Sequence, residues 1–180
     1  MCRILPHLPL KCSDCRKGTK RKKHEESARS RMSRPDWSEY FMQMAHLVAT
    51  RSTCDRKHVG CVLVRDKRVI ATGFNGSVSG GAHCDDVGHD LVTLADGKIN
   101  CQRTTHAELN GLLQAARFGI ATEGAEVYVN TYPCWGCAKA LLSAGVIRVV
   151  VDADYNNDPR VEEAFRLKGV VLIRYKEAEV

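Results

Sequence analysis

Two short stretches of the chain hold residue types that can bind a metal ion beside a proton carrier. His106 stands two residues before Glu108, and Pro133 leads directly into Cys134 and Cys137. An imidazole and two thiolates are good ligands for zinc, and three protein ligands with a fourth position open are typical of catalytic zinc sites. The sequence therefore predicts a catalytic zinc site made of His106, Cys134 and Cys137.

Glu108 supplies the second half of this chemistry. Zinc lowers the pKa of a bound water from ~15.7 towards ~7, which makes hydroxide available at neutral pH. Two residues past the histidine, the Glu108 carboxylate can take the proton of that water and return it to the substrate and the leaving group. The pattern H-x-E with P-C-x-x-C, with these roles, is typical of zinc deaminases of nucleobases.

A closed zinc ribbon is the main structural alternative for the two cysteines. A lone Cys-x-x-Cys pair would favour it, with His106 nearby by chance. Glu108 and the helix-and-strand spacing between the two stretches favour the catalytic site instead. His46 and His58 have no such neighbours in the sequence, and we interpret them as ordinary surface or core histidines.

Apolar residues recur with helical or strand periodicity in a regular order along the chain. We expect helices at about 35–52, 106–118, 134–144 and 160–167, and strands at about 59–64, 69–74, 126–131, 146–151 and 170–174. The first two strands flank a short polar turn and form a β-hairpin. Because the later strands alternate with helices, we expect them to be parallel. The result is an α/β fold, a three-layer α/β/α sandwich around a mixed five-stranded sheet.

Both chemical stretches open predicted helices. In open α/β sheets, sites lie outside the carboxyl ends of the strands, where the following helices begin. The partial positive charge of a helix N-terminus also favours thiolates over thiols. We expect the helix at 106–118 to turn its larger apolar residues towards the core, namely Leu109, Leu112, Leu113 and Ala116.

Two polar loops separate these elements. Residues 75–81 are rich in glycine, which lets backbone amides approach a ligand closely, although a plain flexible connector has the same composition. Residues 83–101 are polar and irregular, and rich in Asp, His and Cys. A loop of this length inside a compact domain is usually functional or held in place by something.

Composition limits the class of protein. With 180 residues and 44% hydrophobic content, the chain suits one globular domain plus a short extension. It has no apolar run long enough to span a membrane, and its first residues lack a signal-peptide pattern. We therefore expect a cytoplasmic protein without membrane association, whose nine cysteines are metal ligands or buried thiols.

The net charge of +6 at pH 7 would suggest nucleic-acid binding, but its position argues against this. Residues 1–31 contain ten Lys and Arg against three Asp and Glu, whereas the remainder contains 17 against 18. We expect residues 1–31 to be a basic, disordered leader. Cys12 and Cys15 within it have metal-pair spacing but few partners. Residues 32–180 are then a nearly neutral folded domain, for which nucleic acid is not an expected partner.

Together with their neighbours, the two chemical stretches resemble a known family. Residues 105–110 and 132–139 resemble the cytidine and deoxycytidylate deaminase superfamily. More narrowly, the resemblance is to deoxycytidylate (dCMP) deaminases, including the bacterial competence-operon type and phage enzymes, at residues 37–42, 51–54, 59–60, 73–77 and 144–146. It covers about residues 36–171, so we expect residues 32–180 to be a zinc-dependent CMP/dCMP-type deaminase domain with the cytidine-deaminase-like fold.

The resemblance implies an activity and its regulation. The expected reaction is the hydrolysis of dCMP to dUMP and ammonia, which feeds thymidylate synthesis, by a homo-hexamer. The expected activator is dCTP with Mg²⁺, and the expected inhibitor is dTTP. By position, His106, Cys134 and Cys137 would bind the catalytic zinc, and Glu108 would shuttle protons.

Roles around the nucleotide also follow from the resemblance. Asn75, followed by Gly76 in the glycine-rich loop, would contact the nucleotide sugar, and Tyr155 would close over the substrate. Arg117 falls where the family has a residue tied to oligomer contacts and allosteric response. Among the basic residues, Arg103 is our candidate for holding the 5′-phosphate.

A second, structural zinc is implied in the long polar loop, where phage and bacterial relatives carry one. Its ligands would be Cys54, Cys84, His89 and Cys101. Four ligands with no open position suit a site that ties down an otherwise unsupported loop. His83 could replace His89, and free buried thiols with solvent-facing histidines are the alternative to any metal.

The chain departs from familiar members of the family in its charged leader and at Gly111. A helix former would be expected at position 111. Glycine lowers helix propensity by up to ~1 kcal/mol, but it can permit close packing. Neither departure touches the chemistry.

Other functions share parts of this pattern. A tRNA adenosine deaminase has the same zinc motif, but the near-neutral domain and the Asn75 loop favour a mononucleotide enzyme. A DNA or RNA cytidine deaminase is disfavoured because no aromatic and basic groove pattern is present. Free cytidine or guanine is a further conceivable substrate. Outside enzymes, the alternative is a zinc-stabilised nucleic-acid-binding module that uses the leader.

Overall fold

The computed structural model describes residues 34–95, 97–155 and 157–175. The chain divides into Met1–Arg34 and a compact unit, Pro35–Val180. All helices and strands of the described residues belong to the second unit. The predicted leader, residues 1–31, lies outside the described residues together with its cysteine pair.

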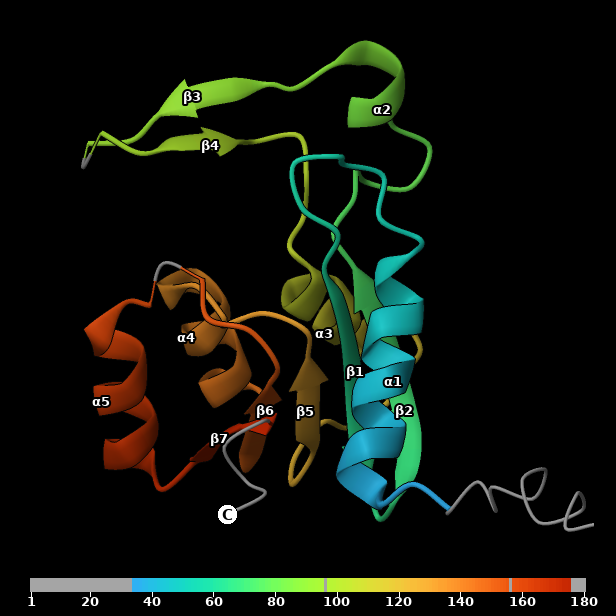
Figure 1. The fold of residues 1–180 in the computed structure, drawn as a ribbon, viewed down its shortest axis with the longest axis vertical. Coiled ribbons are helices and arrows are strands. Elements are labelled where there is room, and N and C mark those ends of the chain that lie inside the picture. The colour runs from blue at the N-terminus through green and yellow to red at the C-terminus, as the bar shows by residue number, and fades with distance from the viewer. Residues whose placement is uncertain (1–33, 96, 156, 176–180) are drawn as a thin grey trace, which may run out of the picture. The chain divides into compact units, whose positions relative to one another are not determined.

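A mixed five-stranded sheet forms the middle of this unit, in the order β2-β1-β5-β6-β7 (Figure 1). Strand β1 (Gly60–Arg65) pairs antiparallel with β2 (Arg68–Phe74) on one side and with β5 (Glu126–Val129) on the other. Strands β5, β6 (Arg148–Val151) and β7 (Val171–Arg174) are parallel. The predicted α/β fold, a hairpin followed by parallel strands, is confirmed.

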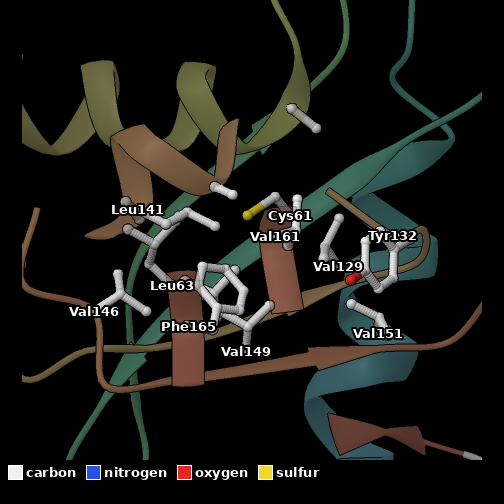
Figure 2. Close-up of a cluster of buried hydrophobic side chains, with 14 of the residues drawn as sticks. Cys61, Leu63, Val129, Tyr132, Leu141, Val146, Val149, Val151, Val161 and Phe165 are labelled. Carbon is white, nitrogen blue, oxygen red and sulfur yellow. The ribbon is translucent and has the colours of Figure 1, made fainter. Parts of the chain in front are cut away.

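Helices cover both faces of the sheet, because successive side chains of a strand point to opposite faces. Val62 and Val64 of β1 pack in one buried cluster with α1 (Trp37–Ala49). Cys61 and Leu63 pack in the other cluster, with residues of α3 (Ala107–Arg117), α4 (Trp135–Ser143) and α5 (Pro159–Lys168). Figure 2 shows part of this second cluster. The three-layer arrangement is thus confirmed.

Two glycines bring α3 unusually close to the first hairpin. A Cβ at Gly73 of β2 would overlap the carbonyl oxygen of Ala107 and the amide of Gly111. A Cβ at Gly111 would lie 2.8 Å from Leu63 Cδ1. The close packing expected of Gly111 is therefore present, and it fixes the position of the helix that begins after His106.

The prediction of which residues of α3 face the core was wrong. The residues that face the sheet are small or belong to the site: Ala107, Glu108, Gly111 and Ala115. Close approach to the sheet leaves no room there for large side chains, so the leucines lie to the side or outside. Leu112 is half-buried, and the exposed residues are Leu109, Leu113 and Ala116.

The segment 83–101 is also more regular than predicted. It contains a short helix, α2 (Cys84–Val87), and an antiparallel pair, β3 (Leu91–Thr93) with β4 (Ile99–Cys101). This hairpin is separate from the five-stranded sheet and stands apart from it at the top of Figure 1. Three-residue strands with mostly exposed side chains carry too little periodicity to be detected in sequence.

No helix in the part of the chain that the structure describes is long and apolar enough to cross a membrane.

Candidate metal centre

Three of the predicted zinc ligands converge at the starts of two helices. His106 is the N-cap residue of α3, Cys134 is the N-cap residue of α4, and Cys137 lies in the first turn of α4. The Nδ1 atom of His106 is 3.5 Å from the Sγ atoms of both cysteines. All three ligand atoms lie within 4.8 Å of one another. The histidine and the two cysteines, which are 28 and 31 positions away from it in sequence, therefore form one cluster.

The spacing of these atoms suits zinc. Zinc–sulfur and zinc–nitrogen bonds of about 2.3 and 2.0 Å in a tetrahedron place neighbouring ligand atoms about 3.5 Å apart. The donor set, one imidazole and two thiols, is also the one that zinc prefers. The side chains fit a zinc ion held by three protein ligands.

The charges in the cluster favour a bound cation. A hydrogen bond with Cys137 and another with His106 lower the pKa of Cys134 to about 4. The same interaction with Cys134 raises the pKa of Cys137, and burial raises it further. Two sulfurs that share one proton become two thiolates when a divalent cation lies between them.

Glu108 lies beside this cluster in the first turn of α3, and only 3% of its surface is exposed. Burial raises the pKa of its carboxyl group, which the nearby His106 partly opposes. A carboxylate with a raised pKa accepts and releases a proton more evenly near neutral pH. The position and the environment of Glu108 suit a proton carrier.

Backbone pairing holds the loops that carry these side chains. Gly76 and Thr105 form an isolated bridge, with hydrogen bonds of 3.1 and 2.8 Å between their backbones. Tyr132, two residues before Cys134, donates its backbone N–H to Ala153 at 2.8 Å. Each metal-binding loop is thereby fixed to a neighbouring segment just before its ligand residue.

A cavity of about 410 Å³ opens onto the cluster. Its wall includes His106, Glu108 and Cys134 together with their neighbours Thr104, Ala107, Thr131, Tyr132, Trp135 and Gly136. The rest of the wall comes from four other segments, and its residues are Cys54, Arg56, Lys57, Val59, Asn75, Leu94, Lys98, Ile99, Asn100, Cys101, Tyr155 and Asp158. This volume lies within the range of ligand pockets in proteins, about 300–1,000 Å³.

Comparison with known proteins assigns the fold and the cluster to a family. Residues 35–153 match the family described as the cytidine and deoxycytidylate deaminase zinc-binding region. The chain belongs to this family. It is 47% identical over 141 residues to the ComE operon protein 2 of Bacillus subtilis, and the match covers 78% of this chain and 72% of that protein.

The names of two further similar proteins include a substrate. The chain is 39% identical over 145 residues to the deoxycytidylate deaminase of Schizosaccharomyces pombe, a match that covers 79% of the chain but 45% of that protein. The chain thus spans about half the length of this relative. A solved structure, the dCMP deaminase of cyanophage S-TIM5 in complex with dCMP and dUMP, has a TM-score of 0.65 and 29% identity over 78% of this chain and 98% of that one.

Only some of the residues predicted to bind substrate or effector line the cavity. Asn75 does, and its amide accepts from the Val59 backbone at 2.8 Å and donates to the Lys57 carbonyl at 2.7 Å. Tyr155 also does, with 49% of its surface exposed. Gly76 pairs with Thr105 instead of lining the cavity.

The two predicted arginines lie elsewhere. Arg103 is not part of the cavity wall, and its Nε donates to the carbonyl of Gly88 at 3.2 Å. Arg117 is the last residue of α3 and is exposed. The structure therefore does not bring Arg103 or Arg117 to the metal cluster.

Sequence reasoning missed several residues of the cavity wall, above all the basic ones. Arg56 and Lys57 follow Cys54, and Lys98 lies in the turn of the β3–β4 hairpin. None of them belongs to a motif, so no sequence signal distinguished them from surface charges.

A second cluster forms where sequence predicted a structural zinc. Cys54 Sγ is 3.8 Å from His89 Nδ1, and Cys84 Sγ is 3.7 Å from Cys101 Sγ. The ligand atoms of Cys54, Cys84 and His89 lie within 4.8 Å of one another. All three cysteines are buried. The structure thus gathers Cys54 from the loop between α1 and β1, Cys84 and His89 from the start of α2 and the loop after it, and Cys101 from the end of β4.

The surroundings of this second cluster favour a metal over free thiols. Backbone hydrogen bonds from Arg103 and Asp90, acting against burial, lower the pKa of Cys101 to about 7, whereas burial and the hydrogen bond with Cys101 raise the pKa of Cys84 to about 12. The other nitrogen of His89 lies 3.0 Å from an Asp55 carboxylate oxygen, an arrangement that commonly orients metal-binding histidines. His83, the alternative ligand, is the N-cap residue of α2 and does not join the cluster.

Proposed function

We propose that the chain catalyses the hydrolytic deamination of dCMP to dUMP and ammonia. The observation that carries the proposal is the convergence of His106, Cys134 and Cys137 beside the buried Glu108, at the wall of a cavity that His106, Glu108 and Cys134 line. Membership of the deaminase family and the similarity to dCMP deaminases support it.

In this proposal zinc, when bound by His106, Cys134 and Cys137, supplies the Lewis acidity that makes a water nucleophilic at neutral pH. Glu108 takes a proton from the attacking water and gives it to the pyrimidine ring. A new C4–oxygen bond forms, and Glu108 then takes the remaining proton of the C4 hydroxyl and passes it to the amino nitrogen. The C4–N4 bond breaks, ammonia leaves, and the hydroxyl oxygen becomes the C4 carbonyl of dUMP. Burial of Glu108 keeps bulk water away from these transfers.

The cavity suits one nucleotide better than a folded RNA. Its volume of about 410 Å³ accommodates a single mononucleotide, and Tyr155 stands half-exposed at its wall as a candidate cover. Asn75 keeps one lone pair and one N–H beyond its two backbone hydrogen bonds, and these are available to a sugar hydroxyl. Gly76 then acts by bridging to Thr105 and holding the histidine loop.

A second zinc is part of the proposal. Cys54, Cys84, His89 and Cys101 would hold it as four protein ligands without an open position, which is typical of structural sites. Such a site would tie α2 and the β3–β4 hairpin to the end of α1.

Regulation and assembly follow from the family resemblance and complete the proposal. We propose a homo-hexamer activated by dCTP with Mg²⁺ and inhibited by dTTP, in which Arg117 contributes to the response. Exposed apolar side chains on and just after α3 support a subunit contact there: Leu109, Leu113 and Phe118. The enzyme would supply dUMP for thymidylate synthesis in the cytoplasm, a reducing compartment that suits its free cysteines.

An ammonia-release assay tests the proposed function. Purified protein with zinc is given dCMP, dCTP, deoxycytidine or a tRNA anticodon stem, each with and without dCTP as effector. We expect the highest kcat/KM for dCMP. No release from dCMP under any condition would reject the proposed function.

A further inference from the structure

Lys57 is a cation in the wall of the cavity that the proposed chemistry does not use. Its Nζ donates to Thr131 Oγ1 at 2.6 Å and lies 3.7 Å from the centre of the Tyr155 ring. All three residues line the cavity, and Lys57 is half-buried. Burial lowers the pKa of its ammonium group. The side chain is thus held against the cavity by a hydroxyl and an aromatic ring.

The ammonium group of Lys57 has no carboxylate to balance it among the described residues. Of the two carboxylates in the cavity wall, Glu108 lies at the metal cluster and Asp158 is bound by Arg160, at 2.6 Å between Nη2 and Oδ2. Arg56 adds a further positive charge, which donates only to the Ile99 carbonyl. A partly buried cation without a counter-charge is unfavourable until an anionic ligand arrives.

The other basic residues near the cavity are less suited to an anion. Lys98 has an interaction of its own among the described residues, and it adds to the effect of Arg160, which is the main cause of the lowered pKa of Asp158. Arg103 donates to Gly88 outside the cavity wall. Arg56 also lacks a carboxylate partner among the described residues, but it is exposed, so Lys57 is the half-buried cation of the cavity wall whose charge those residues leave unbalanced.

We propose that Lys57 binds the 5′-phosphate of the substrate and is the residue by which the site selects a nucleoside monophosphate over a neutral nucleoside. The inference rests on the proposed dCMP deamination. It assigns the phosphate to Lys57 instead of Arg103. An ammonium group has three N–H donors, and Thr131 takes one of them. The face of the Tyr155 ring takes a second, and the remaining N–H is available to a phosphate oxygen.

The test compares two substrates in Lys57→Met, which keeps most of the apolar stem and removes the charge. We expect kcat/KM for dCMP to fall about 10- to 100-fold, the usual effect of losing a hydrogen bond to a charged group. The kcat/KM for deoxycytidine should not fall, because this substrate has no phosphate. Lys57→Arg should restore part of the activity on dCMP.

Two controls separate phosphate binding from other effects. Lys67→Met removes a lysine that also lies over a ring, 5.5 Å from the centre of Trp37, but belongs to the β1–β2 turn. It should leave both substrates unaffected. Zinc content and melting temperature are measured for each variant, and calorimetry compares binding of dUMP with binding of deoxyuridine. Lys57→Met should weaken only dUMP.

The possible contrary results are distinct. Equal losses for dCMP and deoxycytidine would show a structural role for Lys57 and overturn the proposal. Unchanged dCMP kinetics in Lys57→Met, or a selective loss in Arg103→Met instead, would also overturn it while leaving the deaminase activity intact. Inactivity of the wild type on dCMP would reject the proposed function itself, and the dUMP and deoxyuridine titrations would still decide the role of Lys57.

Discussion

At the scale of single residues, the site joins three candidate metal ligands, His106, Cys134 and Cys137, to one buried carboxylate, that of Glu108. The residue types and the two-residue spacings limit what His106, Glu108, Cys134 and Cys137 can do, and the structure places all four together. Short motifs predict this chemistry because metal ligands must lie at fixed positions in the first turns of their helices, which fixes their spacing in sequence. Residues that recognise the substrate have no such constraint.

Glu108→Gln separates proton transfer from metal binding. The amide has nearly the same shape but cannot accept the proton of water, so we expect zinc content to stay unchanged and kcat to fall at least about 100-fold. His106→Ala should lose both zinc and activity because it removes a ligand. Metal analysis and steady-state kinetics measure both effects. An active Glu108→Gln would refute the proton-carrier role.

The substrate residues show where sequence reasoning ends. Arg103 is the phosphate ligand proposed from sequence, yet its side chain donates to the Gly88 carbonyl. Lys57 reaches the cavity because its neighbours Val59 and Asn75 fix the loop before β1, a contact between segments 16 residues apart. Such contacts depend on the tertiary fold, so periodicity and spacing do not reveal them.

At the scale of elements, the β3–β4 hairpin connects the second cluster with the cavity. Cys54 and Cys101 belong to both, whereas Cys84 belongs only to the cluster. The turn of the same hairpin contributes Leu94 and Lys98 to the cavity wall. A metal ion at the cluster would therefore fix one wall of the substrate cavity.

Cys84→Ser tests this connection because Cys84 belongs to the second cluster and is not itself a residue of the cavity wall. We expect the metal content to fall from two zinc ions per chain to one, and KM for dCMP to rise more than kcat falls, because the hairpin loses its anchor while the catalytic cluster stays intact. Val87→Ser is the control, since Val87 lies in the same helix with 56% of its surface exposed. One zinc ion in the wild type would contradict the second site.

The order of elements was predictable, and the face of α3 was not. Alternating strands and helices specify parallel crossovers, whatever the details of packing. The face that a helix buries depends on how closely it approaches its neighbour, and here Gly73 and Gly111 bring α3 close to the sheet. The leucines of α3, which resemble a core face in sequence, are displaced to the outside for this reason.

At the scale of the whole molecule, the proposed hexamer predicts that the exposed leucines of α3 form a subunit contact. Leu113 on α3 has 53% of its surface exposed and Leu167 on α5 has 67%. If α3 forms a subunit contact, Leu113→Glu should shift the hexamer to smaller species, because it buries a charge in an apolar interface. Leu167→Glu should leave the assembly unchanged. Light scattering after gel filtration measures both, and a wild-type monomer would contradict the proposed assembly.

The central claim, hydrolysis of dCMP at the cluster of His106, Cys134 and Cys137, is tested most directly by following the oxygen atom. Zinc-loaded protein is incubated with dCMP in ¹⁸O-labelled water, and the product is examined by mass spectrometry while ammonia is measured. We predict dUMP that carries one ¹⁸O atom, with one ammonia released for each dUMP, and almost none of either with Glu108→Gln. Unchanged dCMP in the wild-type reaction would contradict the account.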